Sequence, residues 1–316
     1  MICLTGDLHH MTLRTGNQAH CDITEIQVAQ RYMRMLDEAG VKVTFFVSGK
    51  SFAEEWTDLE EICRHELVEL GGHNYYCFKP ELWHRLWNKL AGNYNGPYWY
   101  QRWETRKTID AIRNRTGKTI GCWRNHMYMH GPQTERVLAE CGVKICSDGV
   151  ARQSDGPEWR PDGVFNFPLN IMPDHEHLYH AERTPEWVDW WVKRYNWSDD
   201  YGPESFYIEE WTDRVLDELQ RHEEAGVLSN MIIHPITLYL CDKLKSFERI
   251  VDFLATRETI HVSEAIAAAR RNRELSATAT DHSVDHSVDH SVGHAVDRTA
   301  AEVSSQEDQP VVEGAV

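Results

Sequence analysis

Side chains that could do chemistry occur in four short stretches, and each stretch follows or ends an apolar run. These stretches are Leu4–His10, Glu69–Cys77, Cys122–His126 and Met231–Pro235. Their polar groups are carboxylates, imidazoles, a guanidinium and a thiol. Because residues at the carboxyl ends of different strands converge on one pocket in an α/β barrel, we expect these groups to meet. Such a pocket suits metal-assisted hydrolysis.

The elements that would position these groups alternate between strand and helix patterns. Buried strands are expected over residues 2–6 and 41–47, which are almost entirely apolar or β-branched. Helices are expected over 25–39, 208–219 and 240–254, where apolar residues recur at helical spacing. This order predicts an α/β fold with a parallel sheet covered by helices, either a barrel or a doubly wound sheet.

Length and composition predict one large folded body followed by a tail. The chain has 316 residues, of which 41% are apolar, enough for a single barrel over residues 1–273. Residues 274–316 contain Asp-His-Ser-Val repeats and an acidic end without large aromatic residues. We expect this region to be a disordered, histidine-containing low-complexity tail.

Charge and targeting patterns exclude several classes of partner. The net charge of −17 argues against nucleic acid and anionic membranes. No apolar run is long enough to span a bilayer, and no secretory signal precedes the first strand. The eight cysteines form no CxxC pair, which favours reduced, buried thiols. These features together predict a soluble, cytoplasmic protein.

Five sequence motifs share their order and spacing with those of a known family. Beside the family's ATFFVxG, IGNHT, FRPP, EIP and LHP motifs, this chain has Val41–Gly49, Leu70–Asn74, Trp123–Asn125, Asp162–Pro168 and Ile232–Pro235. The chain thus resembles a divergent polysaccharide deacetylase of the NodB-homology, carbohydrate esterase family 4 superfamily. The resemblance covers about residues 2–267. It implies a distorted (β/α)7 barrel, a divalent metal and hydrolysis of an N- or O-linked acetyl group on a carbohydrate.

The resemblance also implies roles for four residues. Asp7 falls on the family's catalytic base, and Arg124 on the arginine that orients this base. His234 falls on the general acid, which protonates the departing amine or alkoxide. His73 falls on a metal-binding histidine.

The motifs depart from the family at the other metal ligands. Leu8 stands where the family usually has a second aspartate, and on a related Asp-x-Asp register His9 takes this place, with His10 beside it. Cys77 replaces the second histidine of the second motif. The candidate metal ligands are therefore His73, His9, His10 and Cys77, a soft set that favours Zn2+.

The substrate is expected to be an acetylated sugar or a related small amide. Candidate contacts are Asn74, Asn125 and His126 in the motifs, His175 and His177 after the EIP-like strand, and Trp99 in an aromatic segment. Segments 83–103 and 187–201 are dense in Trp and Tyr, which either stack on sugar rings or pack on the barrel wall or a subunit interface. The sequence leaves a homo-oligomer open.

Two other functions remain open from the sequence. The first is metal-independent hydrolysis of a small non-sugar amide. The second is a non-catalytic glycan-binding barrel that has lost its metal. The presence of both a base and an acid argues against the second, and metal content separates it from the deacetylase.

Overall fold

Strands and helices alternate along residues 1–11, 13, 19–178 and 183–272, the part of the chain that this computed structural model describes. The strands are β1 (Ile2–Leu8), β2 (Val43–Ser48), β3 (Val68–His73), β4 (Cys122–Trp123), β5 (Ile145–Cys146), β6 (Glu158–Arg160), β7 (Val164–Asn166) and β8 (Ser229–Ile232). The helices are α1 (Glu25–Ala39), α2 (Gly49–Glu54), α3 (Trp56–Arg64), α4 (Glu81–Ala91), α5 (Tyr98–Thr116), α6 (Thr134–Glu140), α7 (Asp174–His177), α8 (Pro185–Tyr195), α9 (Ile208–Glu224), α10 (Pro235–Asp242) and α11 (Lys245–Ala255). Short 3-10 turns occupy His126–Tyr128 and Val262–Glu264. The predicted tail from residue 274 lies outside the described residues.

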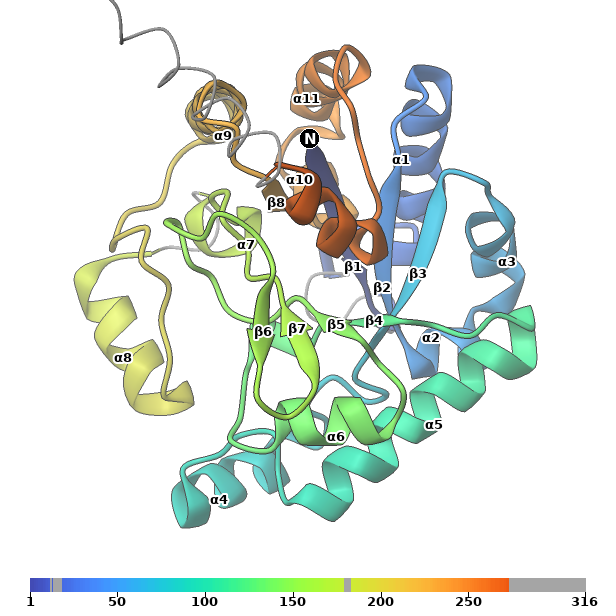
Figure 1. Cartoon of the computed structure of the whole chain (residues 1–316), viewed down its shortest axis with the longest axis vertical. Coiled ribbons are helices and arrows are strands. Elements are labelled where there is room, and N and C mark those ends of the chain that lie inside the picture. Colours follow the sequence, from blue (N-terminus) through green and yellow to red (C-terminus); the bar gives the residue numbers. More distant parts are fainter. Residues whose placement is uncertain (12, 14–18, 179–182, 273–316) are drawn as a thin grey trace, which may run out of the picture. The chain divides into compact units, whose positions relative to one another are not determined.

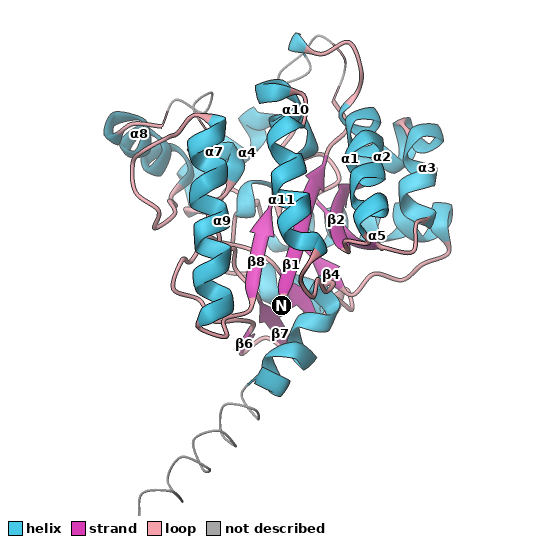
Figure 2. Ribbon diagram, turned by 90° about the horizontal axis from the view of Figure 1, so that it is seen from above, coloured by secondary structure: helices cyan, strands magenta, loops and turns pink. Residues whose placement is uncertain are grey.

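All eight strands of the described residues belong to one sheet, in the order β6-β7-β5-β4-β3-β2-β1-β8. Every neighbouring pair is parallel except β6 and β7. Helices surround the strands, and α9, α11 and α1 lie side by side over β8, β1 and β2 (Figure 1, Figure 2). Seven parallel strands with covering helices confirm the expected α/β fold and its distorted (β/α)7 barrel. No described helix is both long and apolar enough to cross a membrane.

The barrel closes between β8 and the segment after β7 through two buried asparagines. The backbone N–H of Asn170 donates to Asn230 O at 3.1 Å, and the N–H of Asn230 donates to Asn170 Oδ1 at 2.7 Å. The side-chain amide of Asn230 also donates to Phe167 O at 2.8 Å. Side chains thus supply hydrogen bonds at a seam where the described strands form no regular ladder.

The glycine pair in β3 allows large side chains to fill the barrel. A Cβ atom on Gly72 would lie 2.3 Å from the ring of Trp123, and one on Gly71 would lie 2.4 Å from Phe46. Trp123 and Phe46 are fully buried. The glycines therefore serve a close approach of neighbouring side chains at this point of the sheet.

The sequence predicted the beginning and end of α1 correctly, but it missed a break in the helix expected over residues 240–254. Thr24 and Gln27 form the predicted capping box, and Gly40 ends the helix in the left-handed conformation. The single helix expected over 240–254 is wrong. Lys243 and Leu244 have φ angles of 63° and 73°, so the chain turns there and forms α10 and α11.

The parallel register brings the carboxyl ends of the strands to the same rim. Asp7 of β1 is opposite Phe46 of β2, and Ser48 of β2 is opposite His73 of β3. Gly72 is opposite Trp123, so the residues that follow each strand emerge side by side. The polar stretches of the sequence consequently meet above one end of the barrel.

Candidate active site

Asp7 and Arg124 form an ion pair inside the end of the barrel. The guanidinium donates from Nη1 to Asp7 Oδ1 at 3.0 Å and to Thr5 Oγ1 at 2.9 Å. It also donates to the backbone oxygen and the hydroxyl of Ser147, at 3.0 and 2.7 Å. Both charged side chains are buried, so these contacts fix the orientation of the carboxylate. Asp7 Oδ2 remains directed towards two histidines.

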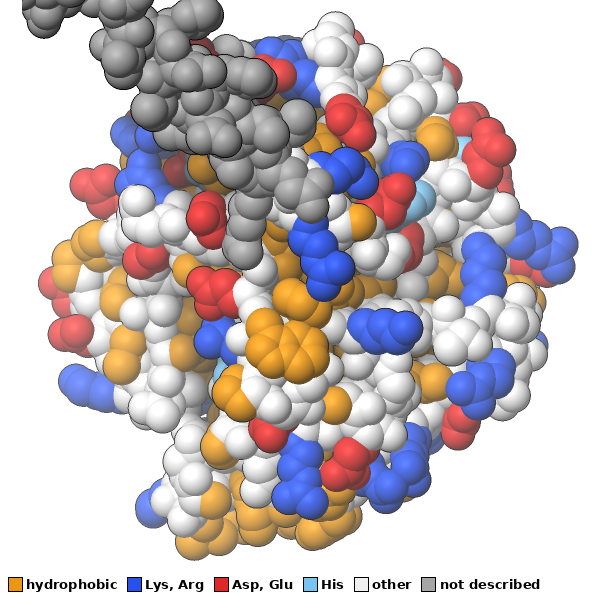
Figure 3. All heavy atoms as spheres, viewed as in Figure 1, with side chains coloured by type: hydrophobic (Ala, Val, Ile, Leu, Met, Phe, Trp, Pro, Cys, Tyr) orange, Lys and Arg blue, Asp and Glu red, His pale blue; other side chains and the backbone are white. Residues whose placement is uncertain are grey.

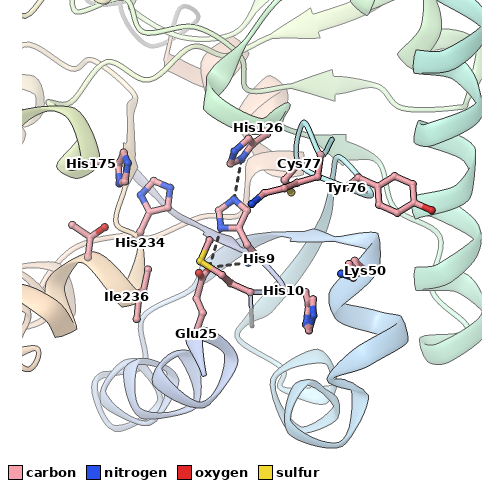
Figure 4. Close-up of a pocket in the computed structure, with 13 residues that line it drawn as sticks. His9, His10, Glu25, Lys50, Tyr76, Cys77, His126, His175, His234 and Ile236 are labelled. Atoms are coloured by element: carbon pink, nitrogen blue, oxygen red, sulfur yellow. Dashed lines mark hydrogen bonds and ion pairs between the residues drawn. The ribbon is translucent and has the colours of Figure 1, made fainter. Parts of the chain in front are cut away.

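Three imidazoles converge beside this carboxylate. His9 Nε2 lies 3.1 Å from both His73 Nε2 and His126 Nδ1, and the latter two nitrogens lie 3.3 Å apart. Cys77 completes the group, because its sulfur lies within 4.8 Å of these atoms. Figure 4 shows the rings of His9 and His126 pointing towards each other, with Cys77 next to them.

Hydrogen bonds on the far side of two rings determine which nitrogens carry protons. His73 Nδ1 lies 2.7 Å from the carbonyl oxygen of Arg124, and His9 Nδ1 lies 3.0 Å from Glu25 Oε1. Both partners are acceptors, so each Nδ1 carries a hydrogen and the two Nε2 atoms face each other at 3.1 Å. Two neutral rings with these tautomers would bring two lone pairs together. A proton or a metal ion held between the two nitrogens makes this contact favourable.

These donor atoms fit a divalent metal ion. Three nitrogens around a tetrahedral Zn2+ at ~2.0–2.1 Å would be separated by about 3.3 Å, close to the separations in this cluster. Burial, and secondly the charge of His9, lowers the pKa of His73 well below its usual value. Burial and the neighbouring His9 likewise lower the pKa of His126. Both rings are therefore neutral, as metal ligands must be.

Residues behind the cluster hold it in place. Glu25, the first residue of α1, also accepts the backbone N–H of His9 at 2.7 Å. Asn74 Oδ1 accepts the backbone N–H of His126 at 2.7 Å, and the Asn74 amide donates to buried Glu104. Such outer contacts fix the direction of ligand rings.

His234 lies next to Asp7, with its ring centre 6.2 Å from that of His9. Its Nδ1 lies 2.8 Å from Asp174 Oδ1, and its Nε2 lies 3.9 Å from Asp7 Oδ2. Burial alone would lower the pKa of His234, but the carboxylates of Asp174, Asp7 and Glu176 outweigh it and raise the pKa to about 9. The imidazole is therefore protonated at neutral pH and can donate a proton from Nε2.

A pocket of ≈ 350 Å³ opens over these groups. Its walls include His9, His126, His175 and His234, the carboxylate of Glu25, and the side chains of Met11, Lys50, Tyr76, Lys79 and Ile236. In Figure 4, His175 and His234 lie on one side of His9, whereas Tyr76 and Lys50 lie on the other. The proton donor His234 and the imidazole cluster thus line the same pocket.

Three candidate residues from the sequence do not lie where they were expected: His10 is outside the imidazole cluster, and His177 and Trp99 are outside the pocket. His10 lines the pocket but stands apart from the imidazole cluster, because its Nδ1 lies 2.7 Å from Glu55 Oε2. His177 is fully buried, and its two ring nitrogens contact Glu204 O and Asp199 rather than the pocket. Trp99 lies on α5, 63% exposed and outside the pocket.

Asn125 and Asn74, both expected to contact the substrate, form hydrogen bonds within the protein. Asn125 donates from its backbone and its side chain to Asp148 at 2.7 Å in both cases. Asn74 supports His126, as described above. His126, expected to contact the substrate, lies within the imidazole cluster, and His175 lines the pocket beside His234.

Sequence reasoning missed Glu25 and the pairing of Asp174 with His234. Glu25 carried a usable signal, since a carboxylate in the first turn of the helix after β1 must lie at the same rim as the strand end. The sequence places Asp174 beside His175 as a candidate ligand of the substrate or of a second ion, but not as the partner of His234. Its contact with His234 joins residues 60 positions apart and has no local signature.

Comparisons with known proteins agree with this architecture. A family model described as polysaccharide deacetylase matches residues 22–146, which include β2, β3 and β4 with His73, Cys77 and Arg124. Over this stretch the chain is similar to the polysaccharide deacetylase family. The family match indicates a hydrolase that acts on amide bonds. Asp7 and His234 lie outside the matched stretch, and it is the fold that brings them to the pocket.

Solved structures share the fold at low sequence identity. A Mycobacterium smegmatis protein assigned as a polysaccharide deacetylase is 17% identical, with a TM-score of 0.61 over 87% of this chain and 90% of its own. A Pseudomonas aeruginosa PAO1 protein with the same assignment is 13% identical, with a TM-score of 0.56 over 85% and 90%. The Puue allantoinase is also 13% identical, with a TM-score of 0.54 over 85% and 89%. No curated protein matches the sequence significantly.

Proposed function

We propose that this protein removes an N- or O-linked acetyl group from a carbohydrate by metal-assisted attack of water. The observation that supports this most strongly is the pair of Nε2 atoms of His9 and His73, which face each other at 3.1 Å. Asp7 Oδ2 lies 4.0 Å from the other ring nitrogen of His73. His126 and Cys77 would complete the ligand set. Burial raises the pKa of the Cys77 thiol, which donates to Asn74 O at 3.4 Å, so Cys77 would have to lose its proton to bind the ion. Three nitrogens and the resulting thiolate would be soft donors, so Zn2+ is the favoured ion.

When bound, the ion would polarise the acetyl carbonyl and acidify a water molecule. The chain supplies the proton transfers. Arg124 holds Asp7 Oδ1, so Oδ2 is the oxygen that takes the proton of the attacking water. His234 Nε2 lies 3.9 Å from this oxygen and gives its proton to the departing amine or alkoxide.

The surroundings of the two groups suit opposite roles. Arg124 forms a direct ion pair with Asp7. Asp174 favours the charged form of His234 through a hydrogen bond on the ring nitrogen that faces away from Asp7. Because one group must accept a proton and the other must donate one, both begin the reaction ready to act.

The first test is the metal content of the purified full-length protein, compared with His73→Ala. Both proteins carry the histidine-containing tail, so the difference between them reports the pocket alone. One equivalent of zinc lost in the variant is expected. Acetate release from acetylated oligosaccharides should then stop in Asp7→Asn and in His234→Ala. Equal metal content in the two proteins, or unchanged turnover in both catalytic variants, would refute the proposal.

A further inference from the structure

A groove runs along the outward face of α5, next to the active-site pocket. Its residues include Trp99, Arg102, Trp103, Arg106 and Lys107 of α5, with Tyr75 across from them. Figure 3 shows basic side chains along the edge of the molecule where α5 runs in Figure 1. None of these residues belongs to the catalytic group described above.

Two adjacent tyrosines separate the groove from the pocket. Tyr75 lines the groove, and Tyr76 lines the pocket. The ammonium group of Lys107 lies over both rings, 3.8 Å from the centre of Tyr75 and 4.3 Å from that of Tyr76. A Cβ atom on Gly49 would lie 2.2 Å from the Tyr75 ring, so this ring is closely packed at the boundary. The Tyr75–Tyr76 pair and Lys107 are thus shared boundary residues of the two openings.

The charge of this region is opposite to that of the whole protein. The chain has a net charge of −17, yet Lys50 and Lys79 line the pocket, and Arg102, Arg106 and Lys107 line the groove. One carboxylate lines each opening, Glu25 in the pocket and Asp110 in the groove, so the cations are in excess in both. Within the described residues, only Arg102 among these five forms an ion pair, at 3.1 Å from Glu140. Unpaired cations in a cleft of an acidic protein attract anionic ligands.

The aromatic side chains of the groove are unusually open to solvent. Trp99 is 63% exposed and Trp103 is 47% exposed, although indole rings are usually buried. A flat apolar ring with a polar edge suits stacking against a sugar ring. The groove thus combines stacking surfaces with two cations, Arg106 and Lys107, that form no ion pair within the described residues.

We propose that this groove binds acidic sugar residues of the same glycan whose acetylated unit occupies the pocket. The substrate class would then be an acetylated oligosaccharide that carries carboxylates. Trp99 and Trp103 would stack on sugar rings, and Arg106 would contact a carboxylate. This inference rests on the proposed deacetylase function and adds the class of substrate to it.

Binding of two defined tetrasaccharides tests the groove directly. One alternates glucuronate with N-acetylglucosamine, and the other is neutral chitotetraose. Calorimetry on the full-length Asp7→Asn protein avoids turnover during the measurement. The acidic tetrasaccharide should bind about fivefold tighter or better at low salt, and high salt should reduce this preference because it screens charges.

Matched variants separate the groove from general surface effects. Arg106→Ala should weaken binding of the acidic tetrasaccharide up to about fivefold and leave the neutral one unchanged. Trp99→Ala should weaken both. The controls are Arg115→Ala, on α5 but outside the groove, and Trp159→Ala, 60% exposed on β6. Both controls should bind like the parent protein.

The outcomes distinguish the groove from the deacetylase proposal. Equal affinity for the two tetrasaccharides, together with no effect of Arg106→Ala, would overturn the groove inference even if the wild type releases acetate from both. Preferential binding that depends on Arg106, without acetate release from either compound, would support the groove and overturn the deacetylase function.

Discussion

Glu25 provides a stringent test of the metal site because it acts only through His9. Its carboxylate is 2% exposed, and Oε1 accepts from His9 Nδ1 at 3.0 Å and from the His9 backbone N–H at 2.7 Å. In Glu25→Ala, nothing obliges Nδ1 to carry the hydrogen, so the ring can place it on Nε2 and lose its lone pair towards the cluster. Loss of such an outer partner typically lowers metal affinity about 10–100-fold, or about 1.4–2.7 kcal/mol.

The assay is zinc affinity measured by competition with a chelator on the full-length protein. Glu25→Gln keeps an oxygen that can accept from Nδ1, so its loss of affinity should be smaller than that of Glu25→Ala. Glu38→Ala, an exposed carboxylate on the same helix, is the matched control and should bind like wild type. His73→Ala gives the background from the tail.

Stability must be measured alongside affinity. Glu25→Ala leaves the His9 backbone N–H without its acceptor, which costs about 1–3 kcal/mol, so urea unfolding should show a loss of this size. The reasoning is refuted if folded Glu25→Ala binds zinc within about twofold of wild type. Glu25 would then not determine the protonated nitrogen of His9, and the lone-pair argument for a metal would fail.

Three further predictions follow from the site and the barrel. Since His234 has a pKa raised to about 9, activity that needs its proton should persist below that pH and fall above it; Asp174→Asn lowers this pKa and should move the alkaline fall of kcat/KM towards neutral pH. Gly72→Ala should lower the free energy of unfolding by about 1–3 kcal/mol in urea, because its Cβ would meet Trp123 at 2.3 Å. Chelation should lower the Tm of wild type but not that of His73→Ala, because only the former has a folded-state metal to lose; equal shifts would contradict the metal site.

The sequence by itself determined the elements and the rim on which the chemistry lies. Apolar runs that end in polar residues predicted parallel strands, and the structure brings Asp7, His73, Arg124 and His234 together at their carboxyl ends. This was predictable because each position depends on local alternation of strand and helix, and a parallel sheet aligns all its carboxyl ends.

Only the tertiary structure decided which neighbouring side chain faces the pocket interior. His9 points into the imidazole cluster, whereas the adjacent His10 turns to Glu55; His175 lines the pocket, whereas His177 is buried against Asp199. In irregular segments between elements, local sequence does not specify which way each side chain turns. That choice depends on contacts with residues far along the chain, and the composition of a histidine-rich stretch does not contain it.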